Sequence, residues 1–140
     1  MSEELIFRFT VDGEDFTSAG QASVQVKKNL RQLGLSADVI KKVSVAMYEG
    51  EINMVIHAGG GIATVRVCEH YVEIILEDHG PGIKDIDLAM QEGYSTATDT
   101  IRSLGFGAGM GLPNMKKYTD LMTINSKVDE GTTIVMRVNC

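Results

Sequence analysis

The amino-acid sequence predicts an α+β fold, a two-layer sandwich in which helices pack on one face of a mixed or antiparallel sheet. About five short segments alternate apolar and polar residues, as half-buried strands do. Two longer segments repeat apolar residues every three or four positions, which is typical of amphipathic helices. The chain has 140 residues, 44% of them hydrophobic, so it can bury one ordinary core but is too short for two domains of usual size. We therefore expect a single domain over residues 1–140.

The first half of the chain predicts one strand and two helices. Residues 5–11 alternate apolar and polar side chains, which indicates a strand with one buried face. From residue 17 or 18 to residue 33 the apolar positions recur at helical spacing. Ser36 can cap a second helix. We expect that helix to end near Ala58, because the three glycines at 59–61 have no side chains to hold helical geometry.

The second half of the chain predicts a sheet interrupted by two helices. Its strands should form two antiparallel pairs, each closed by a short turn. The expected strands are residues 62–67, 71–77, 121–128 and 132–138, and the expected helices are residues 85–93 and 112–118. Residues 94–109 are rich in Ser, Thr and Gly and form a loop longer than a compact domain usually contains. We expect this loop to be either functional or disordered.

The charge balance argues against nucleic acid as a ligand. There are 13 basic and 19 acidic residues, a formal net charge of -6. Such a surface repels polyphosphates at long range, so a nucleotide should need a metal ion. The acidic amino terminus is unlike a signal peptide, and no apolar run approaches the roughly 20 residues that span a bilayer. Cys68 and Cys140 lack metal-ligand spacing, so we expect a reduced, cytoplasmic protein with no membrane part.

The turn from Asp78 to Ile83 is the most informative stretch of the chain. It directly follows the predicted strand 71–77, so it would deliver a carboxylate to the edge of a pocket. Gly80 and Gly82 give the backbone the freedom for a close approach to a flat ligand. The Asp78 carboxylate could accept a hydrogen bond from the exocyclic amino group of adenine, which distinguishes adenine from guanine. The alternative is an ordinary turn aspartate.

Three polar residues form a stripe on the second predicted helix. Glu49, Asn53 and His57 lie at i, i+4 and i+8 on an element otherwise rich in Val, Ile and Met. The Asn53 amide oxygen suits a Mg²⁺ ion carried by phosphate oxygens. Glu49, one turn away, could act as a base. The alternative is the solvated face of a surface helix.

A glycine run at alternating positions precedes the predicted helix 112–118. Its glycines at 105, 107, 109 and 111 could let consecutive backbone N–H groups wrap phosphates at a helix amino terminus, or could simply make a flexible loop. The spacing does not fit G-x-G-x-x-G, and no Gly-Lys-Ser/Thr follows, which excludes the Rossmann and Walker motifs. Thr132 could place a hydroxyl or N–H near phosphate, although an edge-strand threonine pair with Thr133 is an alternative.

Together these motifs resemble the N, G1, G2 and closing boxes of the Bergerat-fold ATPases shared by gyrase, MutL and histidine kinases. The four motifs are Glu49-x-x-x-Asn53, Asp78-x-Gly80-x-Gly82, the glycines at 105, 107, 109 and 111, and Gly131-Thr132-Thr133. The resemblance spans roughly residues 5 to 138. Within the superfamily, residues 77–83, 93–96 and 109–113 are most similar to the anti-sigma-factor and switch-protein serine kinases of bacterial partner-switching systems.

The resemblance implies a histidine-kinase-like ATPase fold that binds Mg-ATP and phosphorylates a serine on a small antagonist protein. It makes Glu49 the base, Asn53 the Mg²⁺ ligand and Asp78 the adenine contact, with residues 94–109 as a lid and Arg102 a candidate for the γ-phosphate. The implied nucleotide-binding residues are Asn53, Asp78, Gly80, Gly82, Ile83, Arg102, Gly105, Gly107, Ala108, Gly109, Met110, Gly111, Leu112 and Thr132.

The resemblance also implies a sigma factor or another signalling protein as a partner, and it leaves a homodimer open. The chain departs from the family between the base and the asparagine, where Gly50, Glu51 and Ile52 stand. Glu51 adds a carboxylate near the metal site, although a residue two positions from Asn53 on a helix could face away. These departures leave a second interpretation, a non-catalytic, ATP-responsive protein-interaction module.

Overall fold

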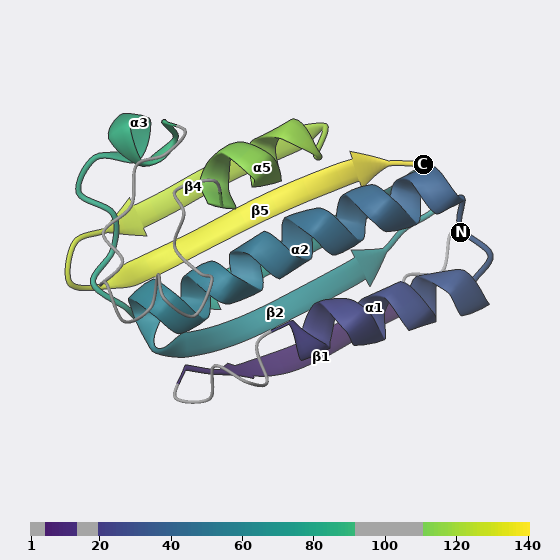
Figure 1. Ribbon diagram of the computed structural model, residues 1–140, viewed down its shortest axis with the longest axis horizontal. Helices are drawn as coiled ribbons and strands as arrows, with labels where there is room; N and C mark the ends of the chain where they lie inside the picture. The colour runs from purple at the N-terminus through teal and green to yellow at the C-terminus, as the bar shows by residue number, and fades with distance from the viewer. Residues whose placement is uncertain (1–4, 14–19, 92–110) are drawn as a thin grey trace.

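The chain folds into two layers, a five-stranded sheet with helices on one face (Figure 1). A computed structural model describes residues 5–13, 20–91 and 111–140. The elements in chain order are β1 (Leu5–Asp12), α1 (Gln21–Gln32), α2 (Ala37–Ala58), β2 (Gly60–Val67), β3 (Tyr71–Asp78), α3 (Ile86–Ala89), α5 (Gly111–Lys117), β4 (Leu121–Lys127) and β5 (Gly131–Asn139). The strand order is β1-β2-β3-β5-β4, and each neighbouring pair is antiparallel. The predicted α+β class is confirmed, and the sheet is antiparallel rather than mixed.

Helix α2 is the central element of the helical layer. It contacts β1, β2, β3 and β5, while α1 and α5 pack against its two sides (Figure 1). Its start is fixed by Ser36, whose hydroxyl accepts a hydrogen bond from the Val39 N–H at 3.2 Å. Its end is fixed by Gly59, which adopts a left-handed conformation with φ 71°. Both predicted ends of this helix therefore agree with the structure.

The three glycines after α2 were all predicted to end the helix, but they have different roles. Only Gly59 ends the helix, and β2 begins at Gly60, two residues before the predicted start. A Cβ on Gly60 would lie 2.3 Å from the Val11 carbonyl oxygen, and one on Gly61 would lie 2.3 Å from that of Glu77. These glycines are therefore needed in the strand, because the backbones on both sides of β2 leave no room for a side chain.

Two other helices differ in extent from their predicted ranges. Helix α1 begins at Gln21, and the predicted start at residue 17 or 18 falls outside the described residues. Helix α3 covers only Ile86–Ala89, against the predicted 85–93. Asp85 caps it instead of belonging to it, because its carboxylate accepts a hydrogen bond from the Leu88 N–H at 3.0 Å.

The hydrophobic core lies between the sheet and the helices. Residues from both layers are completely excluded from solvent there, which is the burial that the alternating and helical patterns predicted. They include Val26, Leu30, Val43, Met47, Val65, Val72, Ile74, Met115, Met136 and Val138.

The opposite face of the sheet carries a buried carboxylate between two arginines. Glu73 accepts hydrogen bonds from Arg66 at 2.6 Å and from Arg137 at 2.8 Å, and its side chain is only 5% exposed. Arg137 also lies over the Tyr71 ring, 4.5 Å from the centroid. Burial acts to raise the pKa of Glu73, but the hydrogen bonds from Arg137 and Arg66 outweigh it, so the pKa lies below its ordinary value.

We expect Glu73→Gln to lower the Tm at pH 7 by about 4 °C or more, because two charge-assisted hydrogen bonds are lost. The pKa of Glu73 is lower in the folded chain than its ordinary value of 4.5. Its ionised form therefore adds stability above that value, and this contribution is lost as the pH falls through the folded pKa. Thermal unfolding between pH 3 and 7 should show the variant approaching wild type below about pH 4.5.

Glu69→Gln is the matched control, since Glu69 lies in the turn before the same strand with 65% of its side chain exposed. Its Tm should follow wild type at every pH. A Glu73→Gln deficit of the same size at pH 3 and pH 7 would contradict the ionic account.

Candidate nucleotide-binding site

Two of the three residues in the predicted polar stripe of α2, Glu49 and Asn53, face α5 rather than open solvent. Asn114 of α5 donates a hydrogen bond from Nδ2 to Glu49 Oε1 at 3.3 Å. Gly111, the first residue of α5, lies against Asn53, and a Cβ there would be 2.9 Å from either the Oδ1 or the Nδ2 atom of the amide. Glu49 and Asn53 are half-buried, whereas His57 is exposed, so the solvated-face alternative holds for His57 alone. The solvated-face alternative therefore does not apply to Glu49 and Asn53.

The Asn53 amide is oriented by Met115. Its Nδ2 lies 3.9 Å from the Met115 sulfur, a weak hydrogen-bond acceptor. In the described part of the chain no hydrogen bond to Asn53 Oδ1 is formed, so this hard oxygen is available to a cation. The described residues contain no cluster of three His, Cys, Asp or Glu side chains that could hold a metal alone. The donor set fits an ion such as Mg²⁺ that brings most of its oxygen ligands as water and phosphate.

His57 completes the stripe near the end of α2. Its side chain is exposed, but partial desolvation by neighbouring groups lowers the pKa of the imidazole below the ordinary value of 6.5, so it is mostly neutral at pH 7. A neutral imidazole adds no positive charge for a phosphate. The charge of a bound nucleotide must therefore be balanced by other groups.

The turn after β3 is attached both to β5 and to the end of α2. Asp78 Oδ1 accepts hydrogen bonds from the Gly80 N–H at 3.0 Å and from the Thr132 N–H at 3.2 Å. Gly80 lies against Ala58, since a Cβ on it would be 2.6 Å from the Ala58 Cα. The carboxylate is thus held at the same end of α2 as Asn53. Its geometry is more constrained than that of an ordinary turn aspartate, because two distant segments fix it.

The far side of this turn is held by β4. Gly82 has φ 76°, and a Cβ there would lie 2.3 Å from the Lys127 carbonyl oxygen. The Ile83 N–H donates a hydrogen bond to the Ser126 hydroxyl at 2.8 Å, and that hydroxyl is 2.7 Å from the Thr132 hydroxyl. Sequence reasoning did not identify Ser126, because its partners come from two other segments of the chain.

Most of the predicted site residues that can be placed meet around one end of α2. Thr132 is on β5, an interior strand, so the edge-strand alternative for its threonine pair is wrong. Leu112 is 9% exposed and belongs to the hydrophobic core. The predicted residues that lie outside the described part of the chain are Arg102, Gly105, Gly107, Ala108, Gly109 and Met110, together with the lid at 94–109.

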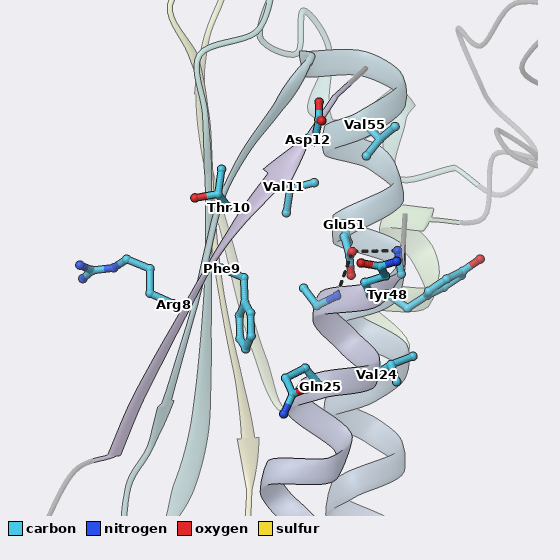
Figure 2. A pocket seen from close by; sticks show the side chains of 13 residues that line it. Arg8, Phe9, Thr10, Val11, Asp12, Val24, Gln25, Tyr48, Glu51 and Val55 are labelled. Carbon is cyan, nitrogen blue, oxygen red and sulfur yellow. Dashed lines mark hydrogen bonds between the residues drawn. The ribbon is translucent and has the colours of Figure 1, made fainter. Parts of the chain in front are cut away.

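Glu51 does not add a carboxylate to this site, because it points to the opposite side of α2 (Figure 2). Its Oε2 accepts hydrogen bonds from the N–H groups of Gly20 at 2.7 Å and Ala22 at 3.2 Å, and its Oε1 accepts one from Ser23 at 3.1 Å. Glu51 is only 2% exposed to solvent. Glu51 therefore caps α1 from another helix and satisfies N–H groups that have no partner within α1.

A signal for this contact exists in the sequence, although it is weak. Gly20, at the start of α1, has no side chain that could cap the helix. An acidic residue on the long apolar helix is a candidate for that role. Its position 31 residues further along the chain hides the pairing from any local pattern.

A hollow of about 800 Å³ lies on this same side of α2, between β1 and α1 (Figure 2). Phe9, Val24, Tyr48 and Val55 are among the residues that line it. Its lining contains none of the predicted nucleotide-binding residues, and Glu51 lies on its wall. The nucleotide site and this hollow are therefore separated by α2.

A comparison with protein families identifies the family of this chain. The family model for the histidine kinase-like ATPase domain matches residues 14–138. The chain belongs to this family. The resemblance drawn from the sequence motifs is thereby confirmed. Within the described residues of this histidine kinase-like ATPase domain, no helix is both long and apolar enough to cross a membrane.

Relatives of this ATPase domain include bacterial regulators. Serine/threonine-protein kinase RsbT of Bacillus subtilis is 34% identical over 118 residues, which cover 81% of this chain and 83% of RsbT. Anti-sigma F factor of Anoxybacillus flavithermus is 31% identical over 119 residues, 81% of this chain and 78% of that protein.

A solved structure of the RsbU and RsbW domains of a Mycobacterium tuberculosis protein has the same fold. The two superpose with a TM-score of 0.66 at 16% sequence identity, over 96% of this chain. The chain corresponds to 32% of that solved chain. The histidine-kinase-like ATPase fold is thus confirmed by structure as well as by sequence.

We expect Glu51→Gln to reduce the free energy of unfolding by about 1–3 kcal/mol. Glutamine has one acceptor oxygen instead of two, and its amide NH₂ would face a backbone N–H of α1. Urea denaturation at pH 7 measures the change. Glu130→Gln is the control, because the Glu130 side chain is 67% exposed. Equal stability of Glu51→Gln and wild type would show that the interhelical cap contributes nothing net.

Proposed function

We propose that this chain is a Mg-ATP-dependent regulatory serine kinase of a partner-switching system, which phosphorylates a serine on a small antagonist protein. The observation that carries the proposal is that Glu49 and Asn53 of α2 lie against α5, while the turn that holds Asp78 lies against the end of the same helix. The name of the relative RsbT, a serine/threonine-protein kinase, supports the same activity. The anti-sigma F factor relatives support a sigma factor or a similar signalling protein as a second partner.

In this proposal Asp78 recognises the base. Its Oδ1 already accepts two backbone hydrogen bonds, which fix the carboxylate and leave Oδ2 for the amino group of adenine. Gly80 and Gly82 let the base approach the main chain of the turn. The bound ATP supplies the γ-phosphoryl group, and its Mg²⁺ reduces the negative charge that the acidic chain would otherwise repel.

In the same proposal, Glu49 and Asn53 act at the γ-phosphate end of the nucleotide. Asn53 would offer Oδ1 to the metal ion, while its Nδ2 contacts the Met115 sulfur. The Asn114 hydrogen bond holds Glu49 Oε1, so Oε2 is free to take the proton of the substrate serine. The serine oxygen forms its bond to the γ-phosphorus as the bond to the ADP oxygen breaks, and the proton goes to Glu49.

Three further parts of the proposal concern residues and properties beyond the described site. A lid over residues 94–109, with Arg102 near the γ-phosphate, would close the site around its phosphates. A cytoplasmic location fits a regulator of soluble partners. A homodimer is compatible with the proposal but is not required by it.

Calorimetric titration with ATP and GTP, each with and without Mg²⁺, tests the nucleotide site. We expect Mg-dependent binding that favours ATP, and we expect Asn53→Ala to weaken it by about tenfold or more, because the protein loses its ligand to the metal. Asn139→Ala is the control, at the opposite end of β5 and exposed. Absence of binding under all four conditions would remove the proposed function.

Phosphotransfer from labelled ATP to candidate antagonist proteins tests the base. We expect Glu49→Gln to reduce the transfer rate about 10² to 10⁴-fold, because the amide cannot take a proton. ATP affinity should stay within about threefold of wild type, since glutamine still accepts the Asn114 hydrogen bond.

Equal losses of transfer and ATP affinity in Glu49→Gln would contradict the assignment of the base. If the wild-type protein formed ATP-dependent complexes with these proteins but transferred no phosphate to them, the result would instead support the non-catalytic interaction module. This alternative arose partly because Glu51 could have added a carboxylate near the metal site. That reason is weaker in the structure, because Glu51 lies on the other side of α2 from the site.

A further inference from the structure

Three polar side chains form a row across the end of the sheet. Asp78 of β3 pairs with Thr132 of β5, and Thr132 pairs with Ser126 of β4. Two residues further from this end, the same three strands carry Leu76, Ile134 and Ile124, which belong to the core or pack against it. Because alternate residues of a strand share a face, the polar row lies on the helix-covered face, directly beside the core.

Ser126 has three close polar neighbours in this row. Its Oγ lies 2.8 Å from the Ile83 nitrogen, 2.7 Å from Thr132 Oγ1 and 3.3 Å from the Gly131 carbonyl oxygen. The Ile83 N–H can only donate, and the Gly131 carbonyl can only accept. Ser126 therefore accepts from Ile83, and its single proton goes either to Gly131 or to Thr132.

Two observations favour the arrangement in which Ser126 donates to Gly131. With its proton donated to Gly131, Ser126 has no second proton, so Thr132 is the donor across the contact of 2.7 Å. This is the one arrangement in which all three contacts of Ser126 are hydrogen bonds. Thr132 is 7% exposed, and if Ser126 donated to it instead, the buried Thr132 hydroxyl proton would have no acceptor among the described residues.

The direction of this proton changes what Thr132 can offer to a ligand. With its proton directed to Ser126, the Thr132 hydroxyl presents only lone pairs. The neighbouring Asp78 carboxylate is also an acceptor only. A base bound at this row would meet two acceptors, which suits an amino group and disfavours a carbonyl oxygen at the same position.

We propose that Ser126 is a positioning residue for base selectivity, which fixes the Thr132 hydroxyl as an acceptor and thereby favours an aminopurine over an oxopurine. The inference rests on the proposed nucleotide function. It adds a residue that makes no contact with the base itself. Without Ser126 the Thr132 hydroxyl is free to rotate and donate to a base carbonyl, so the row would distinguish the two classes less well.

The test is calorimetric titration with Mg-ATP and with Mg-inosine triphosphate, which carries an oxygen where adenine carries the amino group. We expect wild type to prefer ATP and Ser126→Ala to narrow the ratio of the two affinities by about fivefold or more. Ser44→Ala is the control, since the Ser44 hydroxyl bonds only within α2, to the Ile40 carbonyl at 2.6 Å. It should leave the ratio unchanged.

Two further variants separate selectivity from a general loosening of the turn. Thr132→Val removes the acceptor and should also narrow the ratio, which provides a second test if Ser126→Ala does not fold. Adding Ser126→Ala to Thr132→Val should change the ratio no further, because the hydroxyl that Ser126 directs is already gone.

The outcomes distinguish this inference from the function on which it rests. If Ser126→Ala weakened the binding of both nucleotides equally, the ratio of the two affinities would stay that of wild type. This result would overturn the inference but not the proposed nucleotide binding. A ratio of the two affinities that is narrower in the double variant than in Thr132→Val would overturn the inference as well. If wild type bound neither nucleotide, the proposed function and this inference would both fail.

Discussion

The close packing of α2 at Gly50 is the contact on which the rest of the structure depends. A Cβ at this position would lie 2.1 Å from Leu76 of β3 and 3.3 Å from Met115 of α5. Leu76 is 2% exposed and Met115 is completely buried, so neither can move aside without disturbing the core. This glycine sets the distance of α2 from both the sheet and α5. Glu49 and Asn53, on either side of it, are thereby brought to the residues of α5 that orient them.

Close contact at glycines recurs at each junction of the site. Gly80 lies against the end of α2, and Gly111 lies against Asn53. At Gly131, with φ 127°, a Cβ would be 2.2 Å from the Asp78 carbonyl oxygen. Such contacts allow backbone segments from distant parts of the chain to meet without intervening side chains. The site is therefore rigid where its glycines are packed, even though glycine is the residue with the most freedom in an unfolded chain.

The features of the fold and the site that could be predicted from the sequence are those whose cause lies in neighbouring residues of the chain. Periodicity placed the strands and the long helices, and the Ser36 cap and Gly59 end were visible because a helix end is fixed by its nearest residues. The assignment of Gly60 and Gly61 to a break was wrong, because their reason lies in the backbones of the adjacent strands. The sequence allowed Glu51 to face away from the metal site, as it does, but the partners of Glu51 and Ser126 were missed. Each residue bonds to groups at least five residues away, and mostly much further.

The shared helix also explains how recognition of the base and delivery of the phosphates would be linked. The turn that holds Asp78 rests on Ala58, and the proposed metal ligand Asn53 is five residues earlier on α2, a rise of about 7.5 Å. Glu49 is nine residues from Ala58, about 13.5 Å along the same axis. Because the three groups are positioned by one helix, a base held against Asp78 in the proposed way would bring its phosphates toward Asn53 and its reacting end toward Glu49. A base misplaced at the polar row would shift both contacts together, so selectivity at Thr132 and Ser126 would affect the rate of transfer as well as the affinity.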